Sequence, residues 1–322
     1  MSILITGAAG FIGSNLVENF LNEGKKVIGI DNFSRGEAKN ISKFQSNPLF
    51  IFHEMDMNDY KNYHSIIKAE SELEFIDEVW HMAANSDIPA GIKDASVDLK
   101  DTFMTTFYTL QIMQDFDIKF LSFASSSAIY GDLGEIKLVE DVGPLFPISN
   151  YGAMKLASEA SISAAVESYL DAAYIFRFPN VVGVPATHGV ILDFINKLKE
   201  SPQNLKVLGD GTQQKSYLHI NDLINAMIKI RNGSQKGINY YNIGAYDDDG
   251  IPVRDIANLV VERVSPKANI NFGKGNKGWV GDVPKFKYSV DKLVSIGWQP
   301  NLNSIDAIKL AIDEIAHQEN IK

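Results

Sequence analysis

Three residues that could take part in proton transfer are Ser126, Tyr151 and Lys155. Tyr151 and Lys155 are four residues apart, so on a helix their side chains share one face. An ammonium group next to a phenol lowers the pKa of the phenol from its reference value of about 10. A phenol tuned in this way can act as a general base at neutral pH. The pair therefore predicts a proton-transfer site if the rest of the chain supplies a reacting partner.

The elements that must position these residues follow a regular alternation. Short apolar runs alternate with amphipathic stretches, which predicts a parallel sheet covered on both faces, an α/β Rossmann doubly wound fold. Ser126 follows the fifth predicted strand, at the sheet edge where ligands bind in open α/β folds, although serine runs are also common in turns. The predicted strands are 2–6, 26–30, 49–53, 77–83, 119–125 and 173–178, and the predicted helices are 11–22, 59–69, 96–115 and 150–169.

A glycine-rich motif links the first strand to the first helix. Gly7, Gly10 and Gly13 allow a tight turn and a close approach to a pyrophosphate, which would lie on the helix N-terminus. Asp31 follows the last of these glycines by 18 residues (31 − 13), close to the spacing expected of a carboxylate that binds an adenosine ribose. Asp31 would repel a 2′-phosphate, so the motif favours NAD over NADP, while the nearby Arg35 keeps NADP open as an alternative.

The pattern loosens after residue 180. We expect residues 1–178 to form an NAD-binding domain, joined by a returning strand near 239–244. Residues 179–322 are expected to form a smaller C-terminal α/β lobe that binds the substrate. The chain shows no internal repeat and no low-complexity linker.

Composition excludes several classes of function. The 322 residues are 45% hydrophobic and 22% charged, which is typical of a globular protein. A net charge of −10 argues against binding to nucleic acid or to an anionic membrane. The chain has no cysteine, and its six histidines form no short-spaced ligand pair, so we expect no metal site. No apolar run reaches the ~18 residues of a membrane helix, and we expect a cytoplasmic protein.

Several motifs together resemble the extended short-chain dehydrogenases, specifically the NAD-dependent sugar-nucleotide epimerase/dehydratase family. The motifs occur in the family's order over nearly the whole chain, and the pattern is most similar to the UDP-glucose 4-epimerase-like branch. The resemblance implies NAD as cofactor, a nucleoside-diphosphate sugar as substrate and a homodimer paired through helices 96–115 and 150–169. The motifs are "TGAAGFIG", "HMAAN", "SSSAIYG", "YGAMK", "FRFPNVVG", "GDGTQQKSYLHINDL" and "GWVGDVP".

The resemblance also implies a set of cofactor-binding residues. These are Gly7, Gly10, Phe11, Ile12 and Gly13 at the pyrophosphate, Asp31, Asn32, Ser34 and Arg35 at the adenosine ribose, Asp56 and Met57 at the adenine, Met82, Ala83, Ala84 and Ser86 along the middle of the cofactor, and Tyr151, Lys155 and Phe178 at the nicotinamide end.

The implied chemistry is inversion at C4 of the sugar. Tyr151 as phenolate would remove the proton of the C4 hydroxyl while hydride passes to NAD. Ser126 would hydrogen-bond the same hydroxyl, and Lys155 would tune the phenol. Return of the hydride to the opposite face of a 4-keto sugar would give the epimer. The implied substrate-binding residues are Ser126, Ser127, Asn180, Lys215 and Trp279.

Departures from the family's patterns leave alternatives open. Related dehydratases place an Asp-Glu pair where this chain has Ser127 and Ala128, which argues against dehydration. Lys215 and Trp279 stand where many UDP-hexose epimerases have arginines, so the nucleotide is not identified; Lys277 could supply the missing charge. A sugar-nucleotide reductase, dehydrogenase or dehydratase is one alternative, and a non-catalytic NAD-binding regulator is another. Arg177 is predicted to be an internal anchor rather than a substrate ligand.

Overall fold

The chain divides into two compact units whose segments alternate along the sequence. A computed structural model describes residues 2–134, 136–233, 235–246, 250–275 and 287–321. The first unit contains residues 1–129, 145–177 and 227–241, and the second contains the remainder. Among the described residues, no helix combines the length and apolar character that a membrane crossing requires.

The first unit is built on a seven-stranded sheet in the order β12-β7-β5-β4-β1-β2-β3. Neighbouring strands from β7 through β3 are all parallel. This arrangement confirms the predicted Rossmann fold, and the reversal of strand order at β1 places a ligand crevice at the carboxyl ends of the central strands. The strands are β1 (Ser2–Thr6), β2 (Lys26–Asp31), β3 (Phe50–Glu54), β4 (Ile76–His81), β5 (Phe120–Ala124), β7 (Ala172–Arg177) and β12 (Gly237–Asn242).

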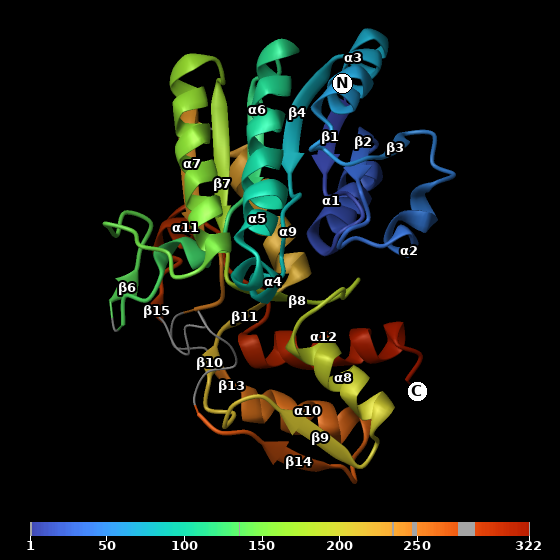
Figure 1. Cartoon of the computed structure of the whole chain (residues 1–322), viewed down its shortest axis with the longest axis vertical. Coiled ribbons are helices and arrows are strands. Elements are labelled where there is room, and N and C mark those ends of the chain that lie inside the picture. Colours follow the sequence, from blue (N-terminus) through green and yellow to red (C-terminus); the bar gives the residue numbers. More distant parts are fainter. Residues whose placement is uncertain (1, 135, 234, 247–249, 276–286, 322) are drawn as a thin grey trace. The chain divides into compact units, whose positions relative to one another are not determined.

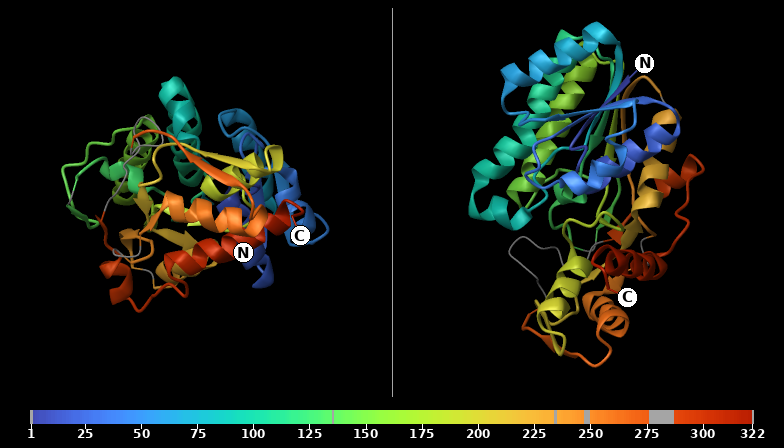
Figure 2. Two further views of the ribbon diagram at one scale, coloured as in Figure 1. Left: turned by 90° about the horizontal axis from the view of Figure 1, so that it is seen from below. Right: turned by 90° about the vertical axis from the view of Figure 1, so that its right-hand side faces the viewer.

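Helices cover both faces of this sheet (Figure 1 and Figure 2). The second view of Figure 2 shows α3, α6 and α7 on one face and α1 on the other. The helical segments are α1 (Phe11–Asn22), α2 (Ala38–Ile41), η1 (Ser42–Phe44), α3 (Tyr60–Leu73), α4 (Ile88–Lys93), α5 (Ala95–Asp98), the π-helix η2 (Leu99–Met104), α6 (Thr105–Asp115), η3 (Ser127–Tyr130), α7 (Asn150–Ser168) and α9 (Ile220–Asn232), the last of which contributes residues to both units.

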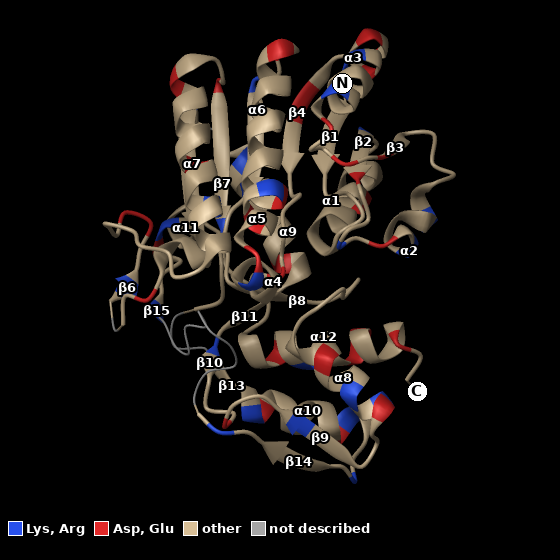
Figure 3. Cartoon of the chain, in the orientation of Figure 1, with Lys and Arg blue, Asp and Glu red and all other residues tan. Residues whose placement is uncertain are grey.

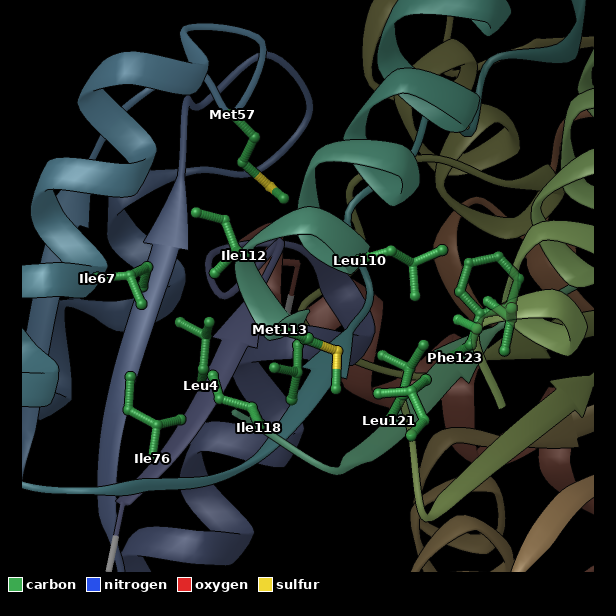
Figure 4. Close-up of a cluster of buried hydrophobic side chains, with 14 of the residues drawn as sticks. Leu4, Met57, Ile67, Ile76, Leu110, Ile112, Met113, Ile118, Leu121 and Phe123 are labelled. Carbon is green, nitrogen blue, oxygen red and sulfur yellow. The ribbon is translucent and has the colours of Figure 1, made fainter. Parts of the chain in front are cut away.

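The core of the first unit lies between the sheet and the helices α3 and α6, which cover one of its faces. Figure 4 shows strand residues such as Leu4 and Leu121 packed against Ile67 of α3 and Met113 of α6. Charged residues lie mostly on helices and loops rather than on the strands (Figure 3). Burial of apolar side chains on both faces of the sheet, at roughly 25 cal/mol per Å², therefore holds the strand ends in fixed positions.

The second unit has its own apolar core, formed by α8, α10 and α12 with short strands. Its paired strands are β8 with β11, β9 with β14, β10 with β13 and β6 with β15. The elements are β6 (Lys137–Leu138), β8 (Asn180–Val182), α8 (Val190–Glu200), β9 (Asn204–Val207), β10 (Gln214–Lys215), β11 (Tyr217–His219), β13 (Ile251–Pro252), α10 (Val253–Val264), β14 (Asn269–Phe272), β15 (Lys287–Tyr288), α11 (Asp291–Ser295) and α12 (Ser304–Gln318).

The helix predicted over 96–115 is interrupted by the π-helix η2. Of the apolar residues along it, Leu110 and Met113 belong to the core of the first unit. Leu99 is 48% exposed and Phe107 is 40% exposed. The expected homodimer contact would therefore rest on Leu99 and Phe107, and the dimer stays a prediction.

His81, the last residue of β4, makes stability depend on pH. The ring is fully buried between Thr6 Oγ1 (2.7 Å from Nδ1) and Thr106 Oγ1 (3.1 Å from Nε2). Burial, helped by the charge of Lys155, lowers its pKa to about 3. In the unfolded chain this histidine has a pKa of about 6.5. Below that pH the unfolded chain binds a proton at His81 that the folded chain does not bind, so stability falls as pH falls.

We expect this histidine alone to lower the free energy of unfolding by about 1.4 kcal/mol between pH 8 and pH 5.5. Urea unfolding at both pH values measures the change. In His81→Gln the loss should be smaller by that amount. Equal losses in the variant and the parent chain would contradict the prediction.

Candidate active site

Glycine is required at two positions where β1 leads into α1, one in the connecting turn and one in the first turn of the helix. A Cβ on Gly13 would lie 2.0 Å from the carbonyl oxygen of Gly7. Gly7 has φ +68°, and a Cβ there would lie 2.8 Å from the backbone nitrogen of Ala83. Gly10 precedes α1, which has no side-chain cap. The first N–H groups of the helix are thus left for an anion, as a pyrophosphate site requires.

Asp31 lies at the end of β2 beside this turn. Its carboxylate accepts hydrogen bonds from the backbone N–H groups of Ala9 (2.9 Å) and Phe33 (2.8 Å). Burial raises the pKa of Asp31, and these bonds oppose the rise. A carboxylate fixed in this way, one strand from the glycine turn, fits the hydroxyls of an adenosine ribose.

The loop after β2 carries the other predicted ribose residues. Asn32, Ser34 and Arg35 are exposed. The Arg35 guanidinium lies 3.3 Å from the carboxylate of Asp87, which follows β4. This ion pair partly occupies Arg35, the cation of this loop that the sequence suggested could attract a 2′-phosphate.

Asp56 and Met57, after β3, have different environments. Asp56 accepts hydrogen bonds from the backbone and side chain of Asn58, both at 2.9 Å. Desolvation acts to raise the pKa of Asp56, but these bonds and the charge of Lys100 bring it below its ordinary value. The Met57 side chain points into the core (Figure 4), so only its backbone is left to face an adenine.

The loop after β4 contains the residues expected along the middle of the cofactor. Met82, Ala83, Ala84 and Ser86 are all half-buried. Asn85 among them is buried, and its backbone N–H donates to Thr102 Oγ1 of η2 (3.2 Å). This bond ties the loop to the interrupted helix.

Ser126, Tyr151 and Lys155 come together at the carboxyl end of β5. Ser149 caps α7 by accepting from the backbone N–H of Gly152 (3.1 Å), which sets the first turn that carries Tyr151. Ser126 acts on the Tyr151 phenol and favours its ionised form. Lys155 Nζ lies 5.8 Å from the centre of the Tyr151 ring and donates to the carbonyl of Ala124 (2.6 Å).

The protonation of this pair corrects one expectation. Burial raises the pKa of Tyr151 to about 12, against a hydrogen bond with Ser126 that lowers it, and the charge of Asp98 raises it further. Burial lowers the pKa of Lys155 to about 7. The predicted net lowering of the phenol's pKa is not found among the protein's own residues, because burial outweighs the other effects and the Lys155 amine donates to a carbonyl.

Asp98 at the end of α5 is a buried carboxylate that the sequence did not reveal. Its Oδ1 accepts from the Asn85 side chain (2.8 Å), whereas Oδ2 has no hydrogen-bond partner among the described residues. A Cβ on Gly91 would lie 1.7 Å from Oδ2, so glycine is needed there. The charge of Asp98 acts on both Tyr151 and Lys155.

The remaining predicted site residues do not all belong to the first unit. Ser127 begins η3 and is half-buried. Phe178, Asn180 and Lys215 belong to the second unit. Asn180 donates to the carbonyl of Ser216 (3.4 Å). Lys277 and Trp279 lie outside the described residues, and among those described no cluster of acidic or histidine side chains could hold a metal ion.

The chain is similar to several known proteins. Residues 3–244 match the model of the NAD dependent epimerase/dehydratase family. A crystal structure of UDP-galactose 4-epimerase is 31% identical, with a TM-score of 0.84 and 99% of each chain covered. The UDP-glucose 4-epimerase of Thermus thermophilus, in complex with NAD, is 28% identical, with a TM-score of 0.82 and 98% of each chain covered.

A curated relative extends the comparison to a third substrate. The UDP-glucuronate 4-epimerase of Thermodesulfobacterium geofontis is 28% identical over 322 aligned positions, which cover 96% of this chain and 94% of the relative. The family match covers most of the chain and contains the glycine turn, Asp31, Tyr151 and Lys155. The chain therefore belongs to the NAD-dependent epimerase/dehydratase family, and NAD is its cofactor.

Proposed function

We propose that this protein is a 4-epimerase of a nucleoside-diphosphate hexose, of the UDP-glucose/UDP-galactose type or an N-acetyl or uronic analogue. The observation that carries the proposal is the cluster of Ser126, Tyr151 and Lys155 at the same edge of the sheet as a glycine turn that fits NAD. Ser127 and Ala128, in place of an acid pair, favour epimerisation over loss of water.

The proposed roles follow from the contacts. Tyr151 takes the proton of the C4 hydroxyl, and Ser126, which acts on the same phenol, holds that hydroxyl in place. Lys155 supplies positive charge next to the phenol. Bound NAD supplies a reversible hydride acceptor and a positively charged ring. The resulting 4-keto sugar turns within the site before reduction on its other face.

The change in the pKa of Tyr151 needed for this role is large. A phenol that titrates near 12 is almost fully protonated at pH 7. We propose that the charge of the nicotinamide ring, added to that of Lys155, makes the phenolate accessible in the loaded enzyme, because nearby positive charge favours the ionised phenol. Proton abstraction would then occur only when cofactor is present.

The direct test is incubation of the purified protein with UDP-glucose, UDP-galactose and their N-acetyl and uronic forms. We expect inversion at C4 of at least one of them, observed by NMR, with no net change in nicotinamide absorbance and no change in product mass. A net absorbance change would instead indicate a reductase or dehydrogenase. Loss of water or carbon dioxide from the sugar would indicate a dehydratase or decarboxylase. Failure to invert any nucleotide sugar would refute the proposal.

A further inference from the structure

Glu159 is a buried acid on the same face of α7 as Tyr151 and Lys155. It follows Lys155 by one helical turn, at i+4, and is 6% exposed. Its carboxylate forms a two-point contact with Arg177 of β7, from Nε at 3.0 Å and from Nη2 at 2.7 Å. Arg177 is 7% exposed and stacks on Tyr240, 5.1 Å from the ring centre. The guanidinium therefore holds the carboxylate in one orientation, as bidentate pairs do.

The same carboxylate also holds the chain segment that carries the catalytic serine. Ser125 donates its hydroxyl to Glu159 Oε1 at 2.5 Å. Ser125 stands between Ala124, whose carbonyl accepts the hydrogen bond from Lys155, and Ser126. Its backbone N–H donates to the carbonyl of Phe176 (2.8 Å). One acid thus links α7, β7 and the end of β5.

The charge of Glu159 is the main one that supports an ammonium on Lys155. Burial lowers the pKa of Lys155 to about 7, while Glu159 first and Asp98 of α5 second act to raise it. From β4, His81 faces the amine and stays neutral, since its pKa is lowered to about 3. The Phe123 ring of β5 lies 4.7 Å from the amine and the Tyr151 ring 5.8 Å from it, and both contribute only π-faces.

We propose that Glu159 is a positioning residue of the reaction: it keeps the Lys155 amine charged and fixes Ser126 against the helix that carries Tyr151. Arg177 orients this acid. The inference rests on the proposed function for its kinetic part only. The charge on Lys155 can be measured in the protein without any sugar substrate.

The decisive variant is Glu159→Gln, which keeps the size of the side chain and a carbonyl to accept from Ser125, and removes the charge. We expect ¹³Cε-lysine NMR titration of the NAD-loaded protein to show the pKa of Lys155 lowered by about one unit, a tenfold smaller ratio of ammonium to amine. Loss of the same resonance in Lys155→Met assigns it. We also expect kcat for epimerisation at neutral pH to fall about tenfold with KM changed less than twofold, because Glu159 does not touch the substrate.

Two further variants separate this role from a purely structural one. Ser125→Ala removes one hydrogen bond of the carboxylate and leaves its charge, so the Lys155 titration should not move. Glu159→Gln alone leaves Arg177 buried without its counter-charge, which can prevent folding. The double variant Glu159→Gln/Arg177→Met removes both charges and restores the fold, and Arg177 is not among the groups that shift Lys155.

The proposal requires that, in the folded double variant, the pKa of Lys155 remains below its value in the parent protein. It also requires that kcat remains low. If the pKa of Lys155 in the folded single or double variant equals that in the parent protein, the proposal is overturned. If the parent protein inverts no nucleotide sugar, the proposed function fails, while the NMR result still decides whether Glu159 controls the charge of Lys155.

Discussion

Tyr151→Phe lowers the rate of C4 inversion by roughly a thousandfold, within the 10²–10⁴ range of general acid–base catalysis, and leaves NAD bound. The variant loses only the phenol hydroxyl, whose pKa Ser126 acts to lower. The ring remains half-buried beside Lys155, so the shape of the site is kept. The rate is measured by NMR on the proposed substrate, and bound NAD by mass spectrometry of the intact complex.

Tyr60→Phe is the matched control for this variant. It also removes one tyrosine hydroxyl, which in the parent chain lies on α3 and donates to the exposed carboxylate of Asp115, the last residue of α6. We expect the control to keep the parental rate and both variants to keep the parental thermal midpoint. If Tyr151→Phe retained more than about a tenth of the parental rate, the general-base role would be excluded, because that loss is smaller than general-base catalysis normally contributes.

Gly13→Ala is expected to abolish tight cofactor binding. The added Cβ would lie 2.0 Å from the Gly7 carbonyl oxygen and 2.7 Å from the Gly7 carbonyl carbon, and backbone atoms cannot move aside as a flexible side chain can. Relief of this clash must open the turn that presents N–H groups to the pyrophosphate. We expect roughly hundredfold weaker NAD binding, about 2.7 kcal/mol, and a loss of ~1–3 kcal/mol in the free energy of unfolding.

Gly233→Ala is the control for the glycine substitution. A Cβ there would meet its nearest atom, the Lys229 carbonyl oxygen, at 3.4 Å, an ordinary contact. Calorimetric titration with NAD and urea unfolding should find the control unchanged. Parental NAD affinity in Gly13→Ala would show that the turn tolerates a methyl group and does not form the cofactor site in this way.

Much of the fold could be predicted because local signals agreed with the global pattern. The helix predicted over 11–22 begins and ends at Phe11 and Asn22, since the glycine turn fixes its start. The helix predicted over 150–169 begins at Asn150 after its Ser149 cap. The meeting of Ser126 with Tyr151 could be expected, since Ser126 follows the carboxyl end of β5 and Tyr151 lies in the first turn of α7, the next long helix of the chain.

The π-helix η2 and the buried acid before it could not be predicted. A π-turn accommodates one extra residue without a dedicated sequence signal, and such segments frequently occur at functional sites. Asp98 lies within the helix predicted over 96–115 and was given no role there, yet it is fully buried beside Gly91. Arg177 was correctly predicted to be an internal anchor, but its partner Glu159, 18 residues away on a different element, depended on tertiary packing.

The pKa values of Tyr151 and Lys155 also could not be predicted from the sequence. Spacing shows that two groups are neighbours, whereas the direction of a pKa shift depends on how much water reaches them. Here burial dominates both groups and drives both toward their neutral forms. Spacing alone predicted a lowered pKa for the Tyr151 phenol, whereas burial raises it.

The burial of Lys155 has a consequence for any attempt to evolve or engineer this protein. A methionine at 155 would fill a similar volume without a desolvated amine, and replacing a buried ionisable group by an apolar one often stabilises a fold. The residue at the centre of the proposed chemistry is thus one that folding alone would not select. A library sorted only for heat resistance would enrich replacements at this position, and its most robust members would be inactive.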